Sequence, residues 1–213
     1  MVITIKNMKE SEDAAIELGM TISELMENAG RCIADAVEDK FGDDIKDKKI
    51  LVVCGRGNNA GDGLVAARYL MDVCKNVEVL LLNGINEMST CAQENCDVIV
   101  DIDPTKVLAF NDDIVMSLDM MKYDLVIDAM VGINCIGELQ YPYSMLAKHM
   151  NASSKTFVVS VDVPSGINGD SLDKGSSTYV NSDLIITMHD TKPSLEDKEF
   201  KEKVIIADIG IPI

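Results

Sequence analysis

Short apolar runs alternate with amphipathic stretches along the chain from residue 49 onward. Several runs are apolar at every position, as in Leu80-Leu81-Leu82, and such runs are typical of strands that are buried on both faces of a parallel sheet. The alternation predicts a Rossmann-like, doubly wound α/β fold with a mostly parallel sheet. Strands are expected over 49–54, 77–82, 97–101, 124–128, 156–161, 183–187 and 203–207, and helices over 62–74, 87–95 and 142–152.

The first forty residues follow a helical period instead, with helices expected over 8–19 and 22–40. Thr21 and Glu24 have the spacing of a capping box at the start of the second helix. Gly30 lies in its interior and costs about 1 kcal/mol relative to alanine, which indicates close packing there. The chain therefore begins with a two-helix extension, and we expect residues 1–213 to form a single domain. The charged stretch 196–203 is expected to be a solvated loop or hairpin.

The composition narrows the function classes. The 213 residues include 36 acidic and 19 basic side chains, a formal net charge of −17, which argues against a nucleic-acid or anionic-membrane partner. No signal peptide is expected, and no apolar run approaches the roughly 18 residues of a membrane span. The 6 cysteines form no C-x-x-C pair, so free thiols in a reducing cytoplasm are expected.

A glycine-dense turn, Cys54-Gly55-Arg56-Gly57-Asn58-Asn59-Ala60-Gly61-Asp62-Gly63, joins the first predicted strand to a predicted helix. Glycines let a ligand approach the backbone, and a helix start offers unpaired N–H groups to an anion. A phosphate site does not require the two asparagines and the aspartate of this turn, so these polar side chains indicate a further function. A purely structural turn, with Asp62 as a helix cap, is the alternative.

Polar residues also follow three later strands: Asp128, then Asp162 with Ser165, then Lys192. Ligands of open parallel sheets bind beyond the carboxyl ends of the strands, so these side chains are candidates for one shared site. The plainer alternatives are a polar strand terminus for Asp128, a proline-glycine turn for 162–166 and a solvated side chain for Lys192. The two histidines, His149 and His189, have no partner at metal-binding spacing.

These motifs together resemble the NAD(P)H-hydrate epimerases, the YjeF N-terminal domain family. The resemblance covers nearly the whole chain and is carried by Leu25-Met26-Glu27-Asn28-Ala29-Gly30, the 55–63 turn, Asp128-Ala129-Met130-Val131-Gly132, Ser160-Val161-Asp162-Val163-Pro164-Ser165-Gly166, Lys192-Pro193 and Ala207-Asp208-Ile209-Gly210-Ile211-Pro212. It implies an isomerase that interconverts the R and S forms of hydrated NADH or NADPH at carbon 6 of the nicotinamide ring. It also implies metabolite repair alongside a dehydratase, and a homodimer formed through the N-terminal helices.

The resemblance assigns roles residue by residue. Potassium ligands would be Asn59, Asp128 and Ser165, whose oxygen atoms suit a hard cation. Asp162 would bind substrate and act as general acid/base while the hydroxyl leaves one face of the ring and returns to the other, with Lys192 as a second proton-handling group. Substrate-binding residues would be Asn58, Asn59, Ala60, Gly61 and Asp62, together with Gly132, Ile133, Asn134, Cys135, Ile136, Gly137 and Glu138.

The sequence departs from the family pattern at Arg56, where proline is usual, and at Ala60, where glycine is common. Two other functions stay open. A dehydrogenase would suit the Gly55-x-Gly57-x-x-Ala60 fingerprint, but strand 77–82 ends in Asn83-Gly84 with no acidic residue for a ribose hydroxyl. A non-catalytic nucleotide-binding or protein-interaction module could share the fold. The dehydratase domain often fused to this family does not follow, so the chain is a stand-alone epimerase or a fragment of a bifunctional enzyme.

Overall fold

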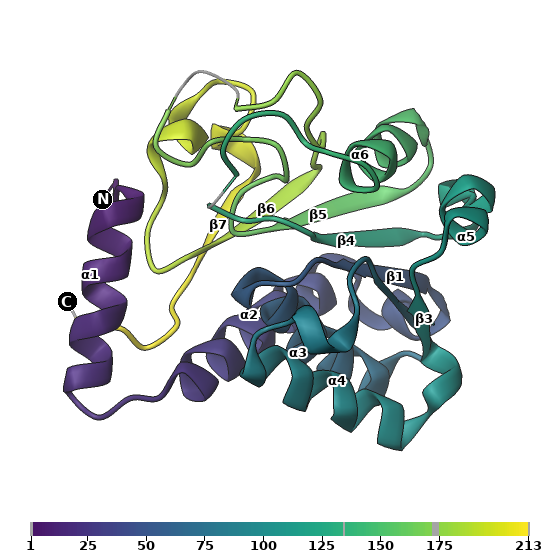
Figure 1. The fold of residues 1–213 in the computed structure, drawn as a ribbon, viewed down its shortest axis with the longest axis horizontal. Helices are drawn as coiled ribbons and strands as arrows, with labels where there is room; N and C mark the ends of the chain where they lie inside the picture. The colour runs from purple at the N-terminus through teal and green to yellow at the C-terminus, as the bar shows by residue number, and fades with distance from the viewer. Residues whose placement is uncertain (1, 134, 172–174, 213) are drawn as a thin grey trace.

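The computed structural model describes residues 2–133, 135–171 and 175–212. Within them the strands form one sheet of seven parallel strands in the order β3-β2-β1-β4-β5-β6-β7 (Figure 1). The chain runs outward from β1 to β3 and then returns to start again at β4, beside β1. This switch point is where open α/β sheets bind ligands. The strands are β1 (Lys49–Cys54), β2 (Asn76–Leu81), β3 (Val107–Ala109), β4 (Leu125–Ala129), β5 (Phe157–Val161), β6 (Leu184–Met188) and β7 (Val204–Ala207).

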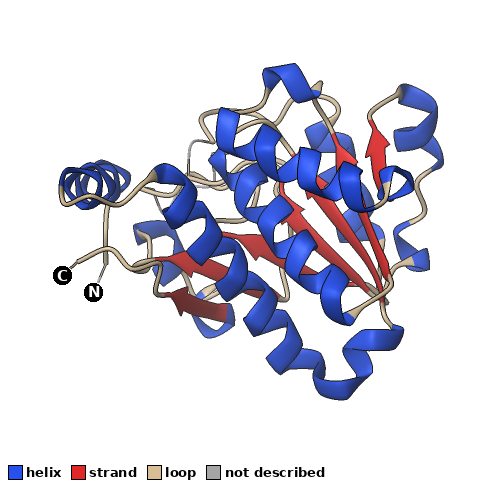
Figure 2. Ribbon diagram, turned by 90° about the horizontal axis from the view of Figure 1, so that it is seen from below, coloured by secondary structure: helices blue, strands red, loops and turns tan. Residues whose placement is uncertain are grey.

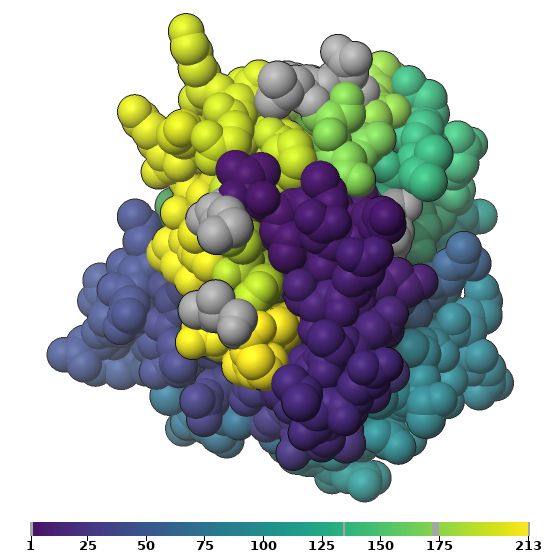
Figure 3. Space-filling view, turned by 90° about the vertical axis from the view of Figure 1, so that its left-hand side faces the viewer, coloured from purple at the N-terminus to yellow at the C-terminus, as the bar shows by residue number. Residues whose placement is uncertain are grey.

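Helices cover both faces of the sheet, which confirms the doubly wound α/β class. One face carries α2 (Ile22–Phe41), α3 (Asn58–Val73) and α4 (Thr90–Ile102), which lie in front of the strands in Figure 2. The other carries α5 (Asp112–Ser117) and α6 (Tyr143–Ala152). Helix α1 (Ile5–Glu17) stands outside these layers, beside the C-terminal segment (Figure 3). The two predicted N-terminal helices are therefore present, but α2 belongs to the sheet layers and only α1 is an extension.

The alternating side chains of β1 supply the two halves of the core. Ile50 and Val52 pack toward the α2 and α3 side, whereas Leu51 and Val53 pack toward α6. All four are fully buried, as continuous apolar runs predict for a covered parallel strand. None of the helices within the described residues combines the length and apolarity needed to cross a bilayer.

Helices α2 and α3 pack unusually closely at Gly30. A Cβ built on this glycine would lie 2.3 Å from Cβ of Val65, so a side chain there would force the helices apart. The predicted capping box is confirmed, because the Thr21 hydroxyl accepts from the Glu24 backbone N–H and Glu24 accepts from the Thr21 N–H in return. These two features fix where α2 begins and how near it lies to the helix that follows β1.

Helix α1 is held at its first turn. The backbone N–H of Ile5 donates to Oδ1 of Asp170 at 2.6 Å, and the N–H of Ile3 donates to the Thr191 carbonyl at 2.8 Å. Val2 also forms an isolated bridge with Thr191. The start of α1 is thus tied to two loops at the carboxyl end of the sheet.

One expected strand needs correction, and one strand was missed. Residues 97–101 are not a strand but the second half of α4, where the buried positions Ala92, Cys96 and Ile99 follow helical spacing. The short edge strand β3 was not predicted. Of the two alternatives expected for the 196–203 stretch, the structure shows the loop: it has 3₁₀ turns at Pro193–Glu196 and Lys201–Lys203, and Phe200 within it is 2% exposed.

Candidate active site

A cavity of about 810 Å³ opens at the carboxyl end of the sheet, beside the switch point between β1 and β4. Its size falls in the usual range for small-molecule sites. The walls come from α1, the first half of α2, the start of α3, the loop after β4 and the residue that follows β5. Segments far apart in the sequence therefore meet around one space, although of the polar strand-end residues Asp128, Asp162, Ser165 and Lys192 only Asp162 lines it.

The glycine turn after β1 forms one wall. Helix α3 begins at Asn58 with Gly57 as its N-cap, and no side chain caps it, so the first N–H groups are available to an anion. Asn58, Asn59 and Asp62 line the cavity. Ala60 and Gly61 are buried and do not line it. A Cβ on Gly61 would lie 2.4 Å from Cε of Met26, so this glycine serves helix packing.

The loop after β4 forms the opposite part of the lining. Gly132, Ile133, Cys135, Ile136 and Glu138 line the cavity, Gly137 does not, and Asn134 lies outside the described residues. The carboxylate of Glu138 accepts hydrogen bonds from the hydroxyls of Ser176 at 3.0 Å and Ser177 at 2.8 Å. The Ser177 donors hold the pKa of Glu138 below its ordinary value. Glu138 thus braces two loops at the cavity wall.

Asp162 follows β5 with a φ of 63°, in the left-handed region that residues other than glycine seldom adopt. Such backbone conformations concentrate at functional sites. Asp162 lines the cavity and is 8% exposed. Its Oδ1 atom accepts from the Thr187 hydroxyl at 3.1 Å and the Met188 N–H at 3.2 Å, and it lies 2.5 Å from Nζ of Lys192. Among the described residues no donor contacts Oδ2, which leaves that oxygen for a ligand.

Lys192 lies behind Asp162 and does not line the cavity. Its side chain is fully buried, and Nζ also donates to the Thr187 hydroxyl at 3.0 Å and the Met188 carbonyl at 2.8 Å. With Asp162 these contacts occupy the three donors of the ammonium group. The geometry therefore gives Lys192 the position of a residue that orients Asp162, and not of one that touches a ligand.

Asp128 and Ser165 meet in a second polar cluster beneath the cavity. The fully buried Asp128 carboxylate accepts from the Ser165 hydroxyl at 2.6 Å, the Ser165 N–H at 2.9 Å and the Ser160 hydroxyl at 2.8 Å. Burial raises the pKa of Asp128, and the Ser165 donors oppose that shift. Neither residue lines the cavity.

Asn59 is linked to this cluster through the loop after β4. The Val131 N–H donates to the Ser165 hydroxyl at 2.9 Å. At the next residue, Gly132, a Cβ would lie only 2.6 Å from Oδ1 of Asn59. Nδ2 of Asn59 is buried and has no partner among the described residues. Asn59 therefore lies beside the loop that contacts Ser165, but among the described residues no hydrogen bond joins it to Asp128 or Ser165, and of the three only Asn59 lines the cavity.

Several lining residues were not identified from the sequence, notably Met8 and Glu12 of α1, Asn83 after β2 and Tyr143 of α6. The Tyr143 hydroxyl bonds to Asn83 at the cavity wall. For Glu12 the available signal was its spacing, because it follows Met8 by four positions and precedes Ala15 by three. Those two are the buried residues of α1, so the helical period places this acidic side chain on the buried face.

The model of one protein family, YjeF-related protein N-terminus, matches residues 22–194. A NAD(P)H-hydrate epimerase from Elusimicrobium minutum is 31% identical over 99% of this chain and 96% of its own length. A NAD(P)H-hydrate epimerase from Plasmodium knowlesi is 38% identical over 87% of this chain and 60% of its own. The bifunctional NAD(P)H-hydrate repair enzyme Nnr of Archaeoglobus fulgidus is 34% identical, and this chain spans 42% of its length.

The crystal structure of yeast ynu0 superposes with a TM-score of 0.79 at 25% identity, covering 97% of this chain and 87% of the yeast chain. The match to the family model and the superposition on the yeast structure both support the same assignment. The chain belongs to the family of YjeF-related protein N-termini.

Proposed function

We propose that this protein interconverts the R and S forms of hydrated NADH or NADPH at carbon 6 of the nicotinamide ring. The observation that carries the proposal is Asp162, which has a left-handed backbone conformation, lines the cavity at the switch point and has no donor to its Oδ2 atom among the described residues. Relatives that match along nearly their whole length bear the name NAD(P)H-hydrate epimerase. Both lines of support point to an isomerase.

The cavity has a place for each part of a dinucleotide. The free N–H groups at the start of α3 and the guanidinium of Arg56, which lines the cavity and is exposed, suit the phosphates. Burial raises the pKa of Tyr143, and the positive charge of Arg56 opposes that shift. The acidic side chains Glu12, Asp62 and Asp162 line the cavity together, and after burial the charge of Asp162 is the next cause that raises the pKa of both Asp62 and Glu12. We place the nicotinamide ring at this acidic end, where a positive charge on the ring is stabilised.

The chemistry follows from that placement. The hydroxyl on carbon 6 takes a proton and leaves as water. As the carbon–oxygen bond breaks, the lone pair of the ring nitrogen forms a double bond to carbon 6, and the ring becomes a cation. Water then adds to the opposite face and gives up a proton. Asp162 exchanges that proton at Oδ2 as general acid/base. Lys192 holds Oδ1 and so fixes the direction of Oδ2; we assign it a positioning role.

A potassium ion fits the residues that the resemblance names. Asp128 carries a fully buried carboxylate, and the described residues include no basic side chain bonded to it. Asn59 supplies an amide beside Gly132, and Ser165 supplies hydroxyl and carbonyl oxygens. Asn59, Asp128 and Ser165 would hold the ion. When bound, it would neutralise the buried charge of Asp128 and stabilise the loop after β4.

The decisive experiment separates the two epimers by chromatography and incubates each with the purified protein, with potassium or with choline as the cation. Interconversion that requires the protein and increases with potassium is expected. A well-folded sample that binds NADPH but leaves both epimers unchanged would favour a non-catalytic module. Hydride transfer to or from the bound cofactor would favour a dehydrogenase.

The cellular setting follows from the same resemblance. A NAD(P)H-hydrate dehydratase is the functional partner we propose, because three of the relatives are bifunctional repair enzymes. The six cysteines are free thiols, which suits a reducing compartment such as the cytoplasm.

Self-association is a further part of the proposal. Ile16, Leu18 and Ile22 at the junction of α1 and α2 are 38, 73 and 48% exposed, and they offer apolar contacts for a homodimer. Light scattering at several protein concentrations tests this assembly, and a mass equal to one chain throughout would contradict it.

A further inference from the structure

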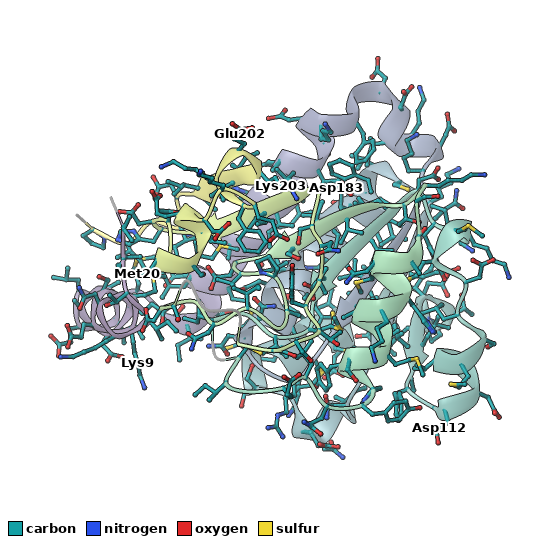
Figure 4. All side chains as sticks on the ribbon, turned by 90° about the horizontal axis from the view of Figure 1, so that it is seen from above. Lys9, Met20, Asp112, Asp183, Glu202 and Lys203 are labelled. Carbon is teal, nitrogen blue, oxygen red and sulfur yellow. The ribbon has the colours of Figure 1, made fainter. Side chains whose placement is uncertain are left out.

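Helix α1 places an acidic side chain in the cavity beside the residues already described. Glu12 lines the cavity together with Asp62 of α3 and Asp162 after β5. It comes from residues that precede the part of the chain matched by the family model, which begins at residue 22. Figure 4 shows α1, marked by Lys9, at the edge of the molecule far from Asp112 on α5.

The three carboxylates differ in how the protein neutralises them. Asp162 has Lys192 and two further donors at Oδ1. Glu12 and Asp62 are both half-buried, and among the described residues neither side chain has a hydrogen-bond partner. Two acids without donors in a ligand-sized cavity carry an electrostatic cost that a single shared proton would reduce.

Electrostatic coupling inside the cavity supports such sharing. Burial raises the pKa of Asp62 well above its ordinary value, and the charges of Asp162 and Glu12 raise it further. Burial also raises the pKa of Glu12, with Asp162 the next contributor. The other charged groups facing Glu12 are Lys192, Asp13 and Lys9.

We propose that Glu12 is a catalytic residue that shares a proton with Asp62, so that this pair serves one face of the substrate ring while Asp162 serves the other. The inference rests on the proposed epimerase function and adds a residue to it. Departure of a hydroxyl from one face and its return to the other requires a proton donor and a proton acceptor, and a single carboxylate would have to reach both faces. Carboxylates on three different elements remove that difficulty.

The proton balance closes over the two directions of the reaction. In one direction the Glu12–Asp62 pair gives the proton that leaves with the hydroxyl as water, and the carbon–oxygen bond breaks. A water molecule then adds to the other face of the cation, a new carbon–oxygen bond forms, and Asp162 accepts the proton. Before the next turnover in the same direction, exchange with solvent removes the proton from Asp162 and returns one to the Glu12–Asp62 pair; the reverse reaction uses the same groups with their roles exchanged, and no oxidant or reductant takes part.

Glu12→Gln tests the inference, with Glu17→Gln as the matched control, since Glu17 is exposed on the same helix and outside the cavity. We expect kcat for both epimers to fall about 100-fold in Glu12→Gln, with KM changed less than about 3-fold, and no change in the control. Glu12→Asp keeps a carboxylate and should recover part of kcat. Wild-type kcat in Glu12→Gln would overturn the inference alone, whereas an inactive wild-type protein would sink the proposed function.

A second measurement does not depend on turnover. Carbon-13 NMR of labelled aspartate carboxyls follows the titration of Asp62 in the wild-type protein and in Glu12→Gln. Removal of the Glu12 charge should shift the Asp62 midpoint to lower pH, because that charge opposes ionisation of Asp62. An unchanged midpoint would show that the two acids do not interact and would overturn the shared proton.

Discussion

Nζ of Lys192 lies 2.5 Å from Oδ1 of Asp162, with the two side chains 0% and 11% exposed. The pair stands at the boundary between the core and the cavity, and its two members face different surroundings. Lys192 has only protein partners, whereas Asp162 lines the cavity and its Oδ2 atom has no donor among the described residues. The ion pair is therefore a structural support for a functional carboxylate.

Replacement of Lys192 by methionine should destabilise the protein strongly. It leaves Asp162 without its counter-charge, and breaking a buried pair costs about 3–5 kcal/mol. Lys201→Met is the control, because its pair with Glu196 is 62% and 39% exposed and is worth less than about 1 kcal/mol. Urea unfolding measures both variants, and equal losses would contradict a special role for the buried pair.

Replacement of Asp162 by asparagine should lower epimerisation by about 10²- to 10⁴-fold, the usual contribution of a general acid/base. Asparagine tolerates the left-handed backbone, so the variant should fold, with lower stability because Lys192 loses its counter-charge. Asp43→Asn changes an exposed residue that does not line the cavity and should keep full activity. Undiminished turnover in Asp162→Asn would remove this carboxylate from the mechanism.

Replacement of Gly132 by alanine should weaken the response to potassium. The new Cβ would lie 2.6 Å from Oδ1 of Asn59 and must displace the amide. The potassium concentration for half-maximal activity should rise about 10-fold, a loss of one good ligand contact of about 1.4 kcal/mol. Gly84→Ala is the control, since its nearest atom lies 3.5 Å away. The prediction fails if both variants respond to potassium as the wild-type protein does.

Replacement of Asp62 by asparagine should stabilise the protein in a pH-dependent way. Burial raises the folded-state pKa of Asp62 well above 3.8, so the folded protein binds this proton more tightly than the unfolded chain. The stability that it contributes is complete below about pH 4 and is lost as the pH rises through the folded-state pKa. Asparagine never ionises and avoids that loss.

The free energy of unfolding should therefore be nearly equal in wild type and Asp62→Asn at about pH 4 and larger in the variant at about pH 8. Urea titrations across this window measure the difference. Asp162, Glu12 and Lys192 face Asp62 and are present in both proteins. Asp72→Asn, an exposed site on the same helix, should show no trend; a flat difference for Asp62→Asn as well would contradict the prediction.

The hydrophobic pattern was sufficient for the sheet wherever strands are covered on both faces. The expected strand 124–128 matches β4, and 156–161 matches β5, within one residue at each end. The pattern was misleading for 97–101, where Val98 and Ile99 are β-branched but belong to α4. Val98 is 43% exposed, so its apolar character does not report burial. The three-residue edge strand β3 is too short to produce a recognisable pattern.

The candidate site was predictable only in part. The rule that ligands bind beyond strand ends drew attention to Asp128 and Asp162, but it does not distinguish a side chain that lines the cavity, as Asp162 does, from one that does not, such as Asp128. Lys192 is the clear case, because its complete burial depends on tertiary contacts with Thr187 and Met188. Glu12 went unnoticed because α1 reaches the cavity from outside the sheet.

The anchoring of the first helix has a practical consequence for anyone trimming this protein. A shortened version that begins at residue 22, where the match to the family model begins, would retain all seven strands of the sheet and yet lack the side of the binding chamber that α1 supplies. Such a protein could pass ordinary tests of folding while failing in catalysis. The hydrogen bonds from Ile3 to Thr191 and from Ile5 to Asp170 should therefore be kept intact in any shortened version, together with the residues that line the cavity.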